Sequence, residues 1–148
     1  MGERLFVEID NDIAEIARLS SLIDGFAERH RLPEAVVFHM KLAFDELLTN
    51  IISYGFHDGR RHKISASMTF ETDMADGDRL AAEIIDDGIA FDPLSCAAPD
   101  LDQPLEDRAI GGLGIHFIRS VMDDVAYHRS QGRNHFKMIK KVPAKPAK

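Results

Sequence analysis

The sequence predicts an α+β protein in which helices cover one face of a single sheet. Three observations lead to this prediction: strand-like stretches come mostly in hairpin pairs, helix-like stretches stand between them, and 148 residues suit one domain with one core. The expected order is strand, helix, helix, strand, strand, long loop, helix, strand, strand. We therefore expect a two-layer α/β sandwich with a mixed, mostly antiparallel sheet.

The first half of the chain is predicted to contain one strand and two helices. Residues 4–9 (RLFVEI) alternate weakly between apolar and polar, which favours a strand. Residues 10–30 open with residues that cap helices and then repeat apolar residues at helical spacing. Pro33 is well placed as the first residue of a second helix, which runs to about Tyr54 and ends at Gly55.

The second half is predicted to contain two hairpins, a long loop and a third helix. Residues 63–71 and 79–86 alternate and form the first hairpin. Residues 113–122 predict a helix, and residues 123–141 predict a closing hairpin that turns near Gln131-Gly132. Between the first hairpin and the third helix lie roughly 25 residues rich in Gly, Pro, Asp and Ala. A structureless loop of that length is usually either functional or a wrong assignment.

The bulk composition excludes several classes of function. The net charge is −7 and no Lys/Arg cluster forms a stripe, so nucleic acid is not expected as a direct partner, whereas a basic protein would suit the acid excess. No apolar run reaches signal-peptide length or the roughly 20 residues that cross a bilayer, so no membrane association is expected. The single cysteine, Cys96, cannot form an internal disulfide, which favours a cytoplasmic location.

One line along the second predicted helix is polar although the helix is otherwise apolar. At about 100° per residue, Glu46 and Asn50 project together between two apolar faces. Two interpretations are open: a groove wall whose acid and amide hold a metal and a water, or a solvated edge where a Glu–Asn hydrogen bond supports the helix. The full stripe is His39, Ala43, Glu46, Asn50 and Ser53.

Two further stretches extend this pattern. Asp86 ends a predicted strand and can aim its carboxylate at a ligand, such as an adenine amino group, while Gly88 lets the backbone pass closely; an ordinary Asp-Gly turn is the alternative. Gly111, Gly112 and Gly114 straddle a predicted helix start, where amide N–H groups and the helix dipole favour phosphate; a flexible hinge is the alternative. The long loop is placed to close over both.

In these motifs the sequence resembles the ATP-binding domain shared by gyrase, Hsp90, histidine kinases and MutL, over nearly the whole chain. DELLTNIISYGF (45–56) resembles its E-x-x-x-N box, and DDGIAFDP (86–93) its first glycine box. IGGLGIHFIRSVMDDVAYHRSQGRNHFKMIK (110–140) resembles its second box and closing hairpin. Within that superfamily the chain most resembles the small stand-alone anti-sigma-factor serine kinases of the RsbW and SpoIIAB type.

The resemblance implies roles for individual residues. Glu46 would be the general base or would orient the attacking hydroxyl, and Asn50 would ligate a Mg²⁺ that bridges the phosphates of ATP. Asp86 would accept a hydrogen bond from the adenine amino group, and Gly88 would give room for the base. The remaining nucleotide contacts would come from the lid and the second glycine box: Arg108, which would reach the γ-phosphate, and Gly111, Gly112, Leu113 and Gly114.

The sequence also departs from the family pattern at two places. Ala90 stands where many relatives have a second glycine, and its small side chain is expected to leave the pocket open. No clear threonine lies in the closing strand, where larger members often place one near the adenine. The far side of the adenine pocket therefore stays undetermined at this point.

The resemblance implies one ATP-binding domain over residues 1–148, with an ATP lid at about 92–112 and a flexible tail at about 142–148. Its implied activity is that of a serine/threonine protein kinase that binds a sigma factor and phosphorylates a STAS-type anti-anti-sigma antagonist. A homodimer in the cytoplasm is expected. Two alternatives are a nucleotide-dependent binding module without phosphotransfer and an orphan histidine-kinase-type ATPase domain.

Three remaining features have less specific interpretations. Phe38 and Ile52 lie opposite the main apolar face of their helix, where they would either form a dimer surface or pack on the first helix. His128 and His135 are expected to face each other across the closing hairpin as a surface pair rather than a metal site. Cys96 falls in the predicted lid, and no neighbour in the sequence clearly predicts a lowered pKa for its thiol.

Overall fold

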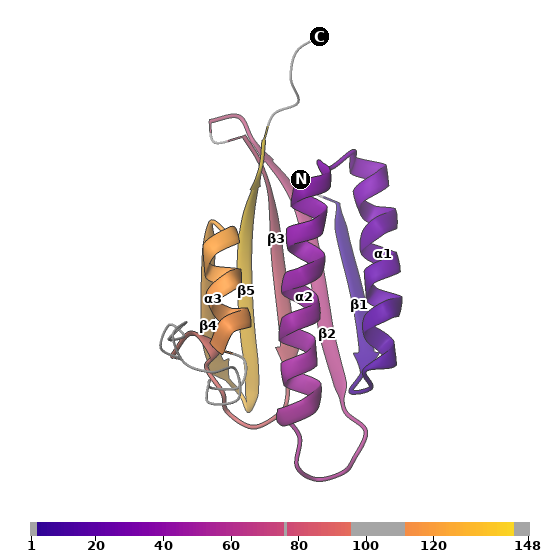
Figure 1. Cartoon of the computed structure of the whole chain (residues 1–148), viewed down its shortest axis with the longest axis vertical. Helices are drawn as coiled ribbons and strands as arrows, with labels where there is room; N and C mark the ends of the chain where they lie inside the picture. Colours follow the sequence, from indigo (N-terminus) through magenta and orange to yellow (C-terminus); the bar gives the residue numbers. More distant parts are fainter. Residues whose placement is uncertain (1–2, 76, 96–111, 144–148) are drawn as a thin grey trace.

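The computed structural model describes residues 3–75, 77–95 and 112–143, and it has the predicted two-layer α+β architecture (Figure 1). The described strands form one sheet in the order β1-β2-β3-β5-β4, and each pairing is antiparallel. The described helices lie side by side on one face of that sheet (Figure 1). In chain order the elements are β1 (Arg4–Asp10), α1 (Ala14–His30), α2 (Glu34–Tyr54), β2 (Lys63–Asp73), β3 (Gly77–Asp86), the short 3-10 turn η1 (Pro93–Ser95), α3 (Gly112–Val121), β4 (Asp124–Ser130) and β5 (Arg133–Val142).

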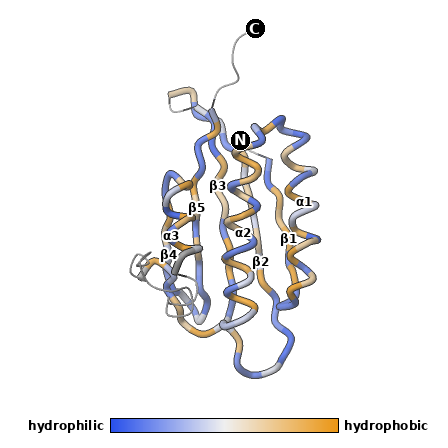
Figure 2. The backbone as a smooth tube through the Cα atoms, viewed as in Figure 1, coloured by the Kyte–Doolittle hydropathy of each residue, from blue (hydrophilic) through white to orange (hydrophobic). Residues whose placement is uncertain are grey.

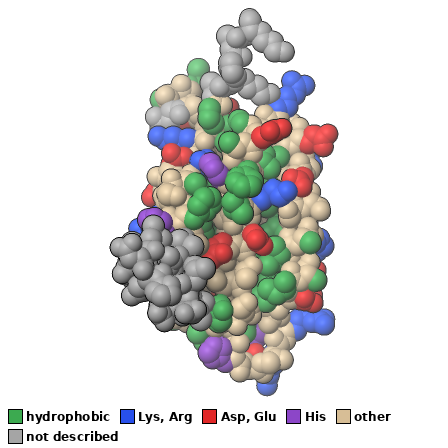
Figure 3. All heavy atoms as spheres, viewed as in Figure 1, with side chains coloured by type: hydrophobic (Ala, Val, Ile, Leu, Met, Phe, Trp, Pro, Cys, Tyr) green, Lys and Arg blue, Asp and Glu red, His purple; other side chains and the backbone are tan. Residues whose placement is uncertain are grey.

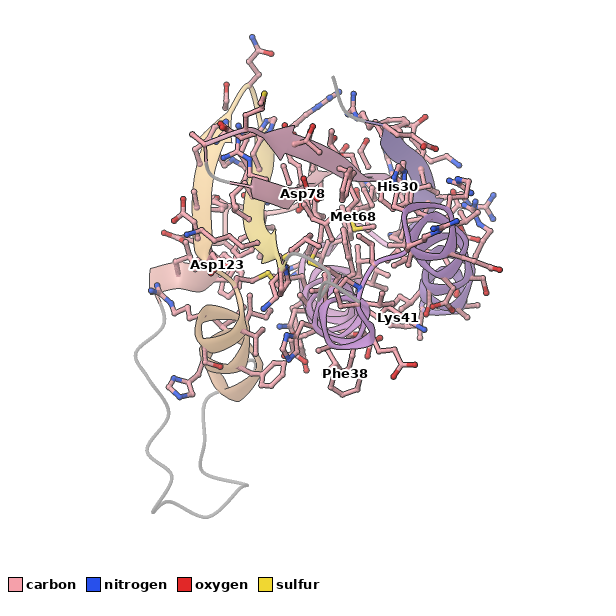
Figure 4. All side chains as sticks on the ribbon, turned by 90° about the horizontal axis from the view of Figure 1, so that it is seen from above. His30, Phe38, Lys41, Met68, Asp78 and Asp123 are labelled. Carbon is pink, nitrogen blue, oxygen red and sulfur yellow. The ribbon has the colours of Figure 1, made fainter. Side chains whose placement is uncertain are left out.

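The core lies between the two layers. Alternate residues of the central strands, such as Met68 and Ile84, are fully buried under the helices. Figure 4 shows Met68 between the sheet and α2, while Phe38 points from α2 away from the sheet. Because α2 lies in the middle of the helical layer, it needs a broad apolar surface, and its buried side chains are Val36, Met40, Ala43, Phe44, Leu47 and Leu48.

The element boundaries differ from the expected ones only in detail. Pro33 caps α2 in an extended conformation, with a ψ of 146°, so the helix begins one residue later at Glu34. At the start of α1 the N-cap residue Ile13 makes no side-chain cap hydrogen bond, but Asp12 Oδ1 accepts one from the Ala14 amide at 3.0 Å. The hairpin between β4 and β5 turns at Gln131-Gly132, both with positive φ, as the sequence predicts.

Strand register brings the later site residues together. Asp86, the last residue of β3, pairs with Asn134 near the start of β5. Figure 2 shows that the connection from α2 to β2 is largely hydrophilic, whereas hydrophobic residues recur along α2 above the sheet. Figure 1 shows that the end of α2, the end of β3 and the start of β5 lie at the same end of the sandwich.

Candidate functional site

A cavity of about 250 Å³ opens where α2, β3, α3 and the β4–β5 hairpin meet. Its walls are mostly apolar, with polar groups from Asn50, Asp86, Tyr127 and Asn134. Ligand pockets for whole small molecules usually reach roughly 300–1,000 Å³, so this cavity is sized for part of a ligand, such as a flat ring. The other lining residues are Leu47, Ile51, Tyr54, Gly55, Ile89, Phe91, Pro93, Ile115 and Phe136.

Asp86 supplies a buried acceptor in the cavity wall. It is only 5% exposed, and its Oδ1 accepts hydrogen bonds from the Gly88 amide at 2.9 Å and from Asn134 Nδ2 at 3.0 Å. Within the described residues Oδ2 has no such partner. Burial raises the pKa of Asp86, while the two donated hydrogen bonds act in the opposite direction. Asp86 Oδ2 is therefore available to accept a hydrogen bond from a ligand.

Gly88 is required by a close approach of two backbone segments. The Ile89 amide donates to the Gly55 carbonyl at 2.9 Å, which ties the turn after β3 to the end of α2. A β-carbon on residue 88 would lie 2.5 Å from the Gly55 oxygen and 2.9 Å from Asp86 Oδ1. Ala90, in contrast, is exposed and is not among the residues that line the cavity.

Glu46 and Asn50 lie at the other end of the site, beside the start of α3. Asn50 Nδ2 donates to Glu46 Oε1 at 3.3 Å, and Asn50 also lines the cavity. A side chain on Gly114 would overlap the Glu46 carboxylate, so the glycine-rich helix start contacts this acid directly. The predicted acid–amide pair and the second glycine box are thus adjacent. Figure 3 shows acidic side chains near the centre of this face of the molecule.

Several predicted site residues lie outside the described part of the chain. These are Arg108 and Gly111, together with most of the predicted lid, Cys96 and the end of the tail. Gly112 is the first residue of α3, and the side chain of Leu113 is not described. The phosphate end of the site is therefore represented here by Glu46, Asn50 and Gly114.

Asn134 is the main polar wall residue that the sequence analysis missed. It is 7% exposed and stands opposite Asp86, on the side of the cavity that the sequence left undetermined. Tyr127 and Arg129 of β4 both donate to its Oδ1. The available signal was its place in the alternation of β5, where Asn134 precedes the core-facing Phe136 and Met138.

The remaining predictions concern surfaces away from this cavity. Phe38 is 58% exposed and lines an open hollow between α1 and α2, while Ile52 packs partly buried against the core. Lys41, which points toward α1 in Figure 4, pairs there with Asp24 at 3.0 Å. His128 faces His135 as predicted, with the rings stacked at 4.4 Å. No helix in the described ranges is long and apolar enough to cross a membrane.

The arrangement fits a ligand with a flat, amino-bearing ring and an anionic tail. The apolar walls suit a ring, Asp86 Oδ2 accepts from an amino group, and the start of α3 attracts anions. Asn50 uses its Nδ2 toward Glu46, which leaves its Oδ1 as an oxygen ligand of the kind that Mg²⁺ accepts together with phosphate oxygens. The residues present therefore fit a magnesium-bound polyphosphate.

Comparison with known proteins agrees with this chemistry. The model of the histidine kinase-like ATPase domain matches residues 9–140. The serine/threonine-protein kinase BtrW of Bordetella bronchiseptica is 31% identical over 113 residues, which cover 76% of each chain. The serine-protein kinase RsbW of Listeria monocytogenes is 26% identical over 82% of this chain and 75% of its own. That of Bacillus cereus is 25% identical over 88% of this chain and 80% of its own.

Proposed function

The chain belongs to the histidine kinase-like ATPase domain family, and we propose that it is an ATP-dependent serine/threonine protein kinase. One observation carries the proposal. Asp86 and Asn50 line the same cavity, and Glu46, which accepts a hydrogen bond from Asn50, lies against Gly114 near the start of α3. Such a site would suit an adenine ring beside Asp86 and the phosphates of ATP beside Asn50 and Glu46.

The reaction would transfer the γ-phosphoryl group of ATP to a serine hydroxyl. Glu46 would accept the hydroxyl proton or orient the hydroxyl, while the oxygen of the serine forms the new bond to phosphorus. The bond between the γ-phosphorus and its bridging oxygen breaks, and ADP leaves. Asn50 would hold Mg²⁺, which neutralises charge on the phosphates when bound. Arg108 and the glycines at 111 and 112 would complete the phosphate contacts.

The names of the relatives, serine/threonine-protein and serine-protein kinases, support transfer to a serine hydroxyl. The proposed substrate is a STAS-type anti-anti-sigma antagonist, and the proposed second partner is a sigma factor. In this partner-switching scheme one cytoplasmic domain over residues 1–148 acts as a homodimer, and its lid at about 92–112 closes over ATP. The net charge of −7 suits a basic partner surface.

Calorimetry with Mg·ATP and Mg·ADP on the wild type and on Asn50→Ala tests the nucleotide site. Magnesium-dependent binding that collapses in Asn50→Ala is the expected result. A transfer assay with γ-labelled ATP and a STAS-domain protein, followed by mapping of the modified residue, then tests the activity. Phosphoserine supports the kinase, and phosphohistidine supports a histidine-kinase-type domain. Binding of nucleotide and partner without transfer would leave a nucleotide-dependent binding module.

A further inference from the structure

Asn134 is the most completely hydrogen-bonded side chain in the cavity wall. Its Nδ2 donates to Asp86 Oδ1 at 3.0 Å and to the Ile89 carbonyl at 2.8 Å. Its Oδ1 accepts from Tyr127 Oη at 2.5 Å, from Arg129 Nη1 at 3.1 Å and from the Phe91 amide at 3.5 Å. Both hydrogens of the amide nitrogen are therefore used.

These partners also fix which way the amide points. Donors of three kinds surround Oδ1, whereas a carboxylate and a carbonyl face Nδ2, so rotating the amide by half a turn would set like groups against each other. Arg129 strengthens the arrangement because its Nη1 also donates to the Gly88 carbonyl at 2.8 Å. Asn134 is thus locked as a donor toward Asp86.

The consequence for Asp86 is that its two oxygens have different roles. Oδ1 is occupied by Asn134 and the Gly88 amide, so Oδ2 is left to meet a ligand. Asn134 itself has no hydrogen left to offer a base. At this end the cavity presents an acceptor and no free donor from these two residues. A purine with an oxygen at position 6 would place two acceptors in contact.

We propose that Asn134 is the positioning residue for base selection, because it holds Asp86 so that the cavity takes a 6-amino purine and rejects a 6-oxo purine. The inference rests on the proposed function, since the ring is that of the proposed nucleotide. Recognition of the amino group belongs to Asp86, and Asn134 acts through Asp86 rather than on the base. Its removal should therefore change selectivity more than general affinity.

The test compares three triphosphates that differ at position 6 of the purine: ATP, inosine triphosphate, and purine riboside triphosphate, which has hydrogen there. Wild-type protein should bind ATP roughly tenfold to a hundredfold more tightly than the other two, as expected for a hydrogen bond to a charged group. In Asn134→Ala this advantage should shrink to within about threefold. Asn11→Ala is the matched control, because Asn11 makes hydrogen bonds to Arg60 and His62 away from the cavity.

A second variant covers the case in which Asn134→Ala fails to fold. Asn134→Asp keeps the shape but replaces the donating amide by a carboxyl, and two adjacent carboxyls share a proton. That proton lies between the two carboxyls and not on Oδ2, and the amide that fixed Asp86 is gone, so the advantage of ATP over inosine triphosphate should shrink. The inference is overturned if either variant weakens all three nucleotides by one common factor, or if both keep the wild-type ratios.

The outcomes separate this inference from the proposed function. Wild-type protein that binds none of the three nucleotides would overturn both. Wild-type binding with ratios that do not respond to Asn134 would overturn only the role of Asn134. Selective ATP binding that depends on Asn134, without any phosphotransfer, would support the inference while the kinase proposal fails.

Discussion

The two ends of the candidate site differ in how completely their side chains are already held. At the base end, Asp86 and Asn134 are buried and share a hydrogen-bond network with Tyr127, Arg129 and the backbone. At the phosphate end, one hydrogen bond of 3.3 Å joins Asn50 to Glu46. This difference suggests that base recognition is built into the fold, while the catalytic geometry is completed when a ligand arrives.

The largest expected effect is at Glu46. Glu46→Gln keeps the size and the acceptor for Asn50 but removes the carboxylate, so phosphotransfer should fall by roughly 10²- to 10⁴-fold. ATP affinity should change little, because the base end is untouched. Single-turnover transfer and calorimetry on the same protein measure the two quantities separately.

Asp45→Asn is the matched control for this change. Asp45 is the exposed neighbour of Glu46 on α2 and lines the hollow between α1 and α2 instead of the cavity. The variant removes the same charge from the same helix and should leave transfer unchanged. Equal losses in the two variants would show that net charge, and not the Glu46 carboxylate, controls the rate.

The next largest effect is expected at Gly114. A methyl group there would overlap the Glu46 carboxylate, which is the flexible end of a side chain and can move away. Gly114→Ala should therefore fold normally yet lose about a hundredfold in transfer rate, since a displacement of about 1 Å can cost that much. Rates and thermal melting are measured in parallel. A variant with normal transfer would show that Glu46 does not act from its observed position.

Gly88→Ala provides the contrast at the base end. Here the new methyl group would lie 2.5 Å from the Gly55 carbonyl, which is backbone and cannot swing aside. We expect a loss of about 1–3 kcal/mol in the free energy of unfolding, together with weaker ATP binding. Gly25→Ala in α1 is the control, because its nearest neighbour would be Arg29 Nη1 at an ordinary 3.7 Å. Denaturant titration of both variants decides whether the clash is real.

The parts of the site that local motifs encode were predictable from the sequence, including Asp86 and Gly88 at the base end. The residues of the phosphate end come from local motifs: helical spacing aligns Glu46 with Asn50, and glycines mark the start of α3. The α+β class was likewise predictable from periodicity, because hairpin turns and apolar alternation are local signals.

The network around Asn134 was not predictable in this way. It depends on the register of β3 with β5 and of β5 with β4, which places Asp86, Asn134 and Arg129 in one row. The residues next to Asn134 in the sequence do not indicate that its partner, Asp86, lies 48 residues earlier in the chain. An asparagine, Asn134, occupies the wall where larger members of the superfamily often place a threonine.

The smallest expected effect concerns a tether outside the base end. His62 stacks on Phe56 and pairs with Asp58 at 2.8 Å and with Asp87 at 3.0 Å, which links the α2–β2 connection to the turn after β3. The hydrogen bond with Asp58, followed by the charges of both carboxylates, raises the pKa of His62, while partial desolvation opposes this. The tether is strongest when His62 is protonated.

Stability should therefore depend on pH in a defined direction. Because the pKa of His62 is higher in the folded protein than its ordinary value of 6.5, its contribution is complete below pH 6.5 and is lost as the pH rises through the folded pKa. The melting temperature of the wild type should fall slightly over that interval, and His62→Gln should flatten the curve. His57→Gln, in the same connection but bonded to the Tyr54 carbonyl, should retain the wild-type slope. A wild-type melting temperature that rises over the same interval would contradict a stabilising tether through protonated His62.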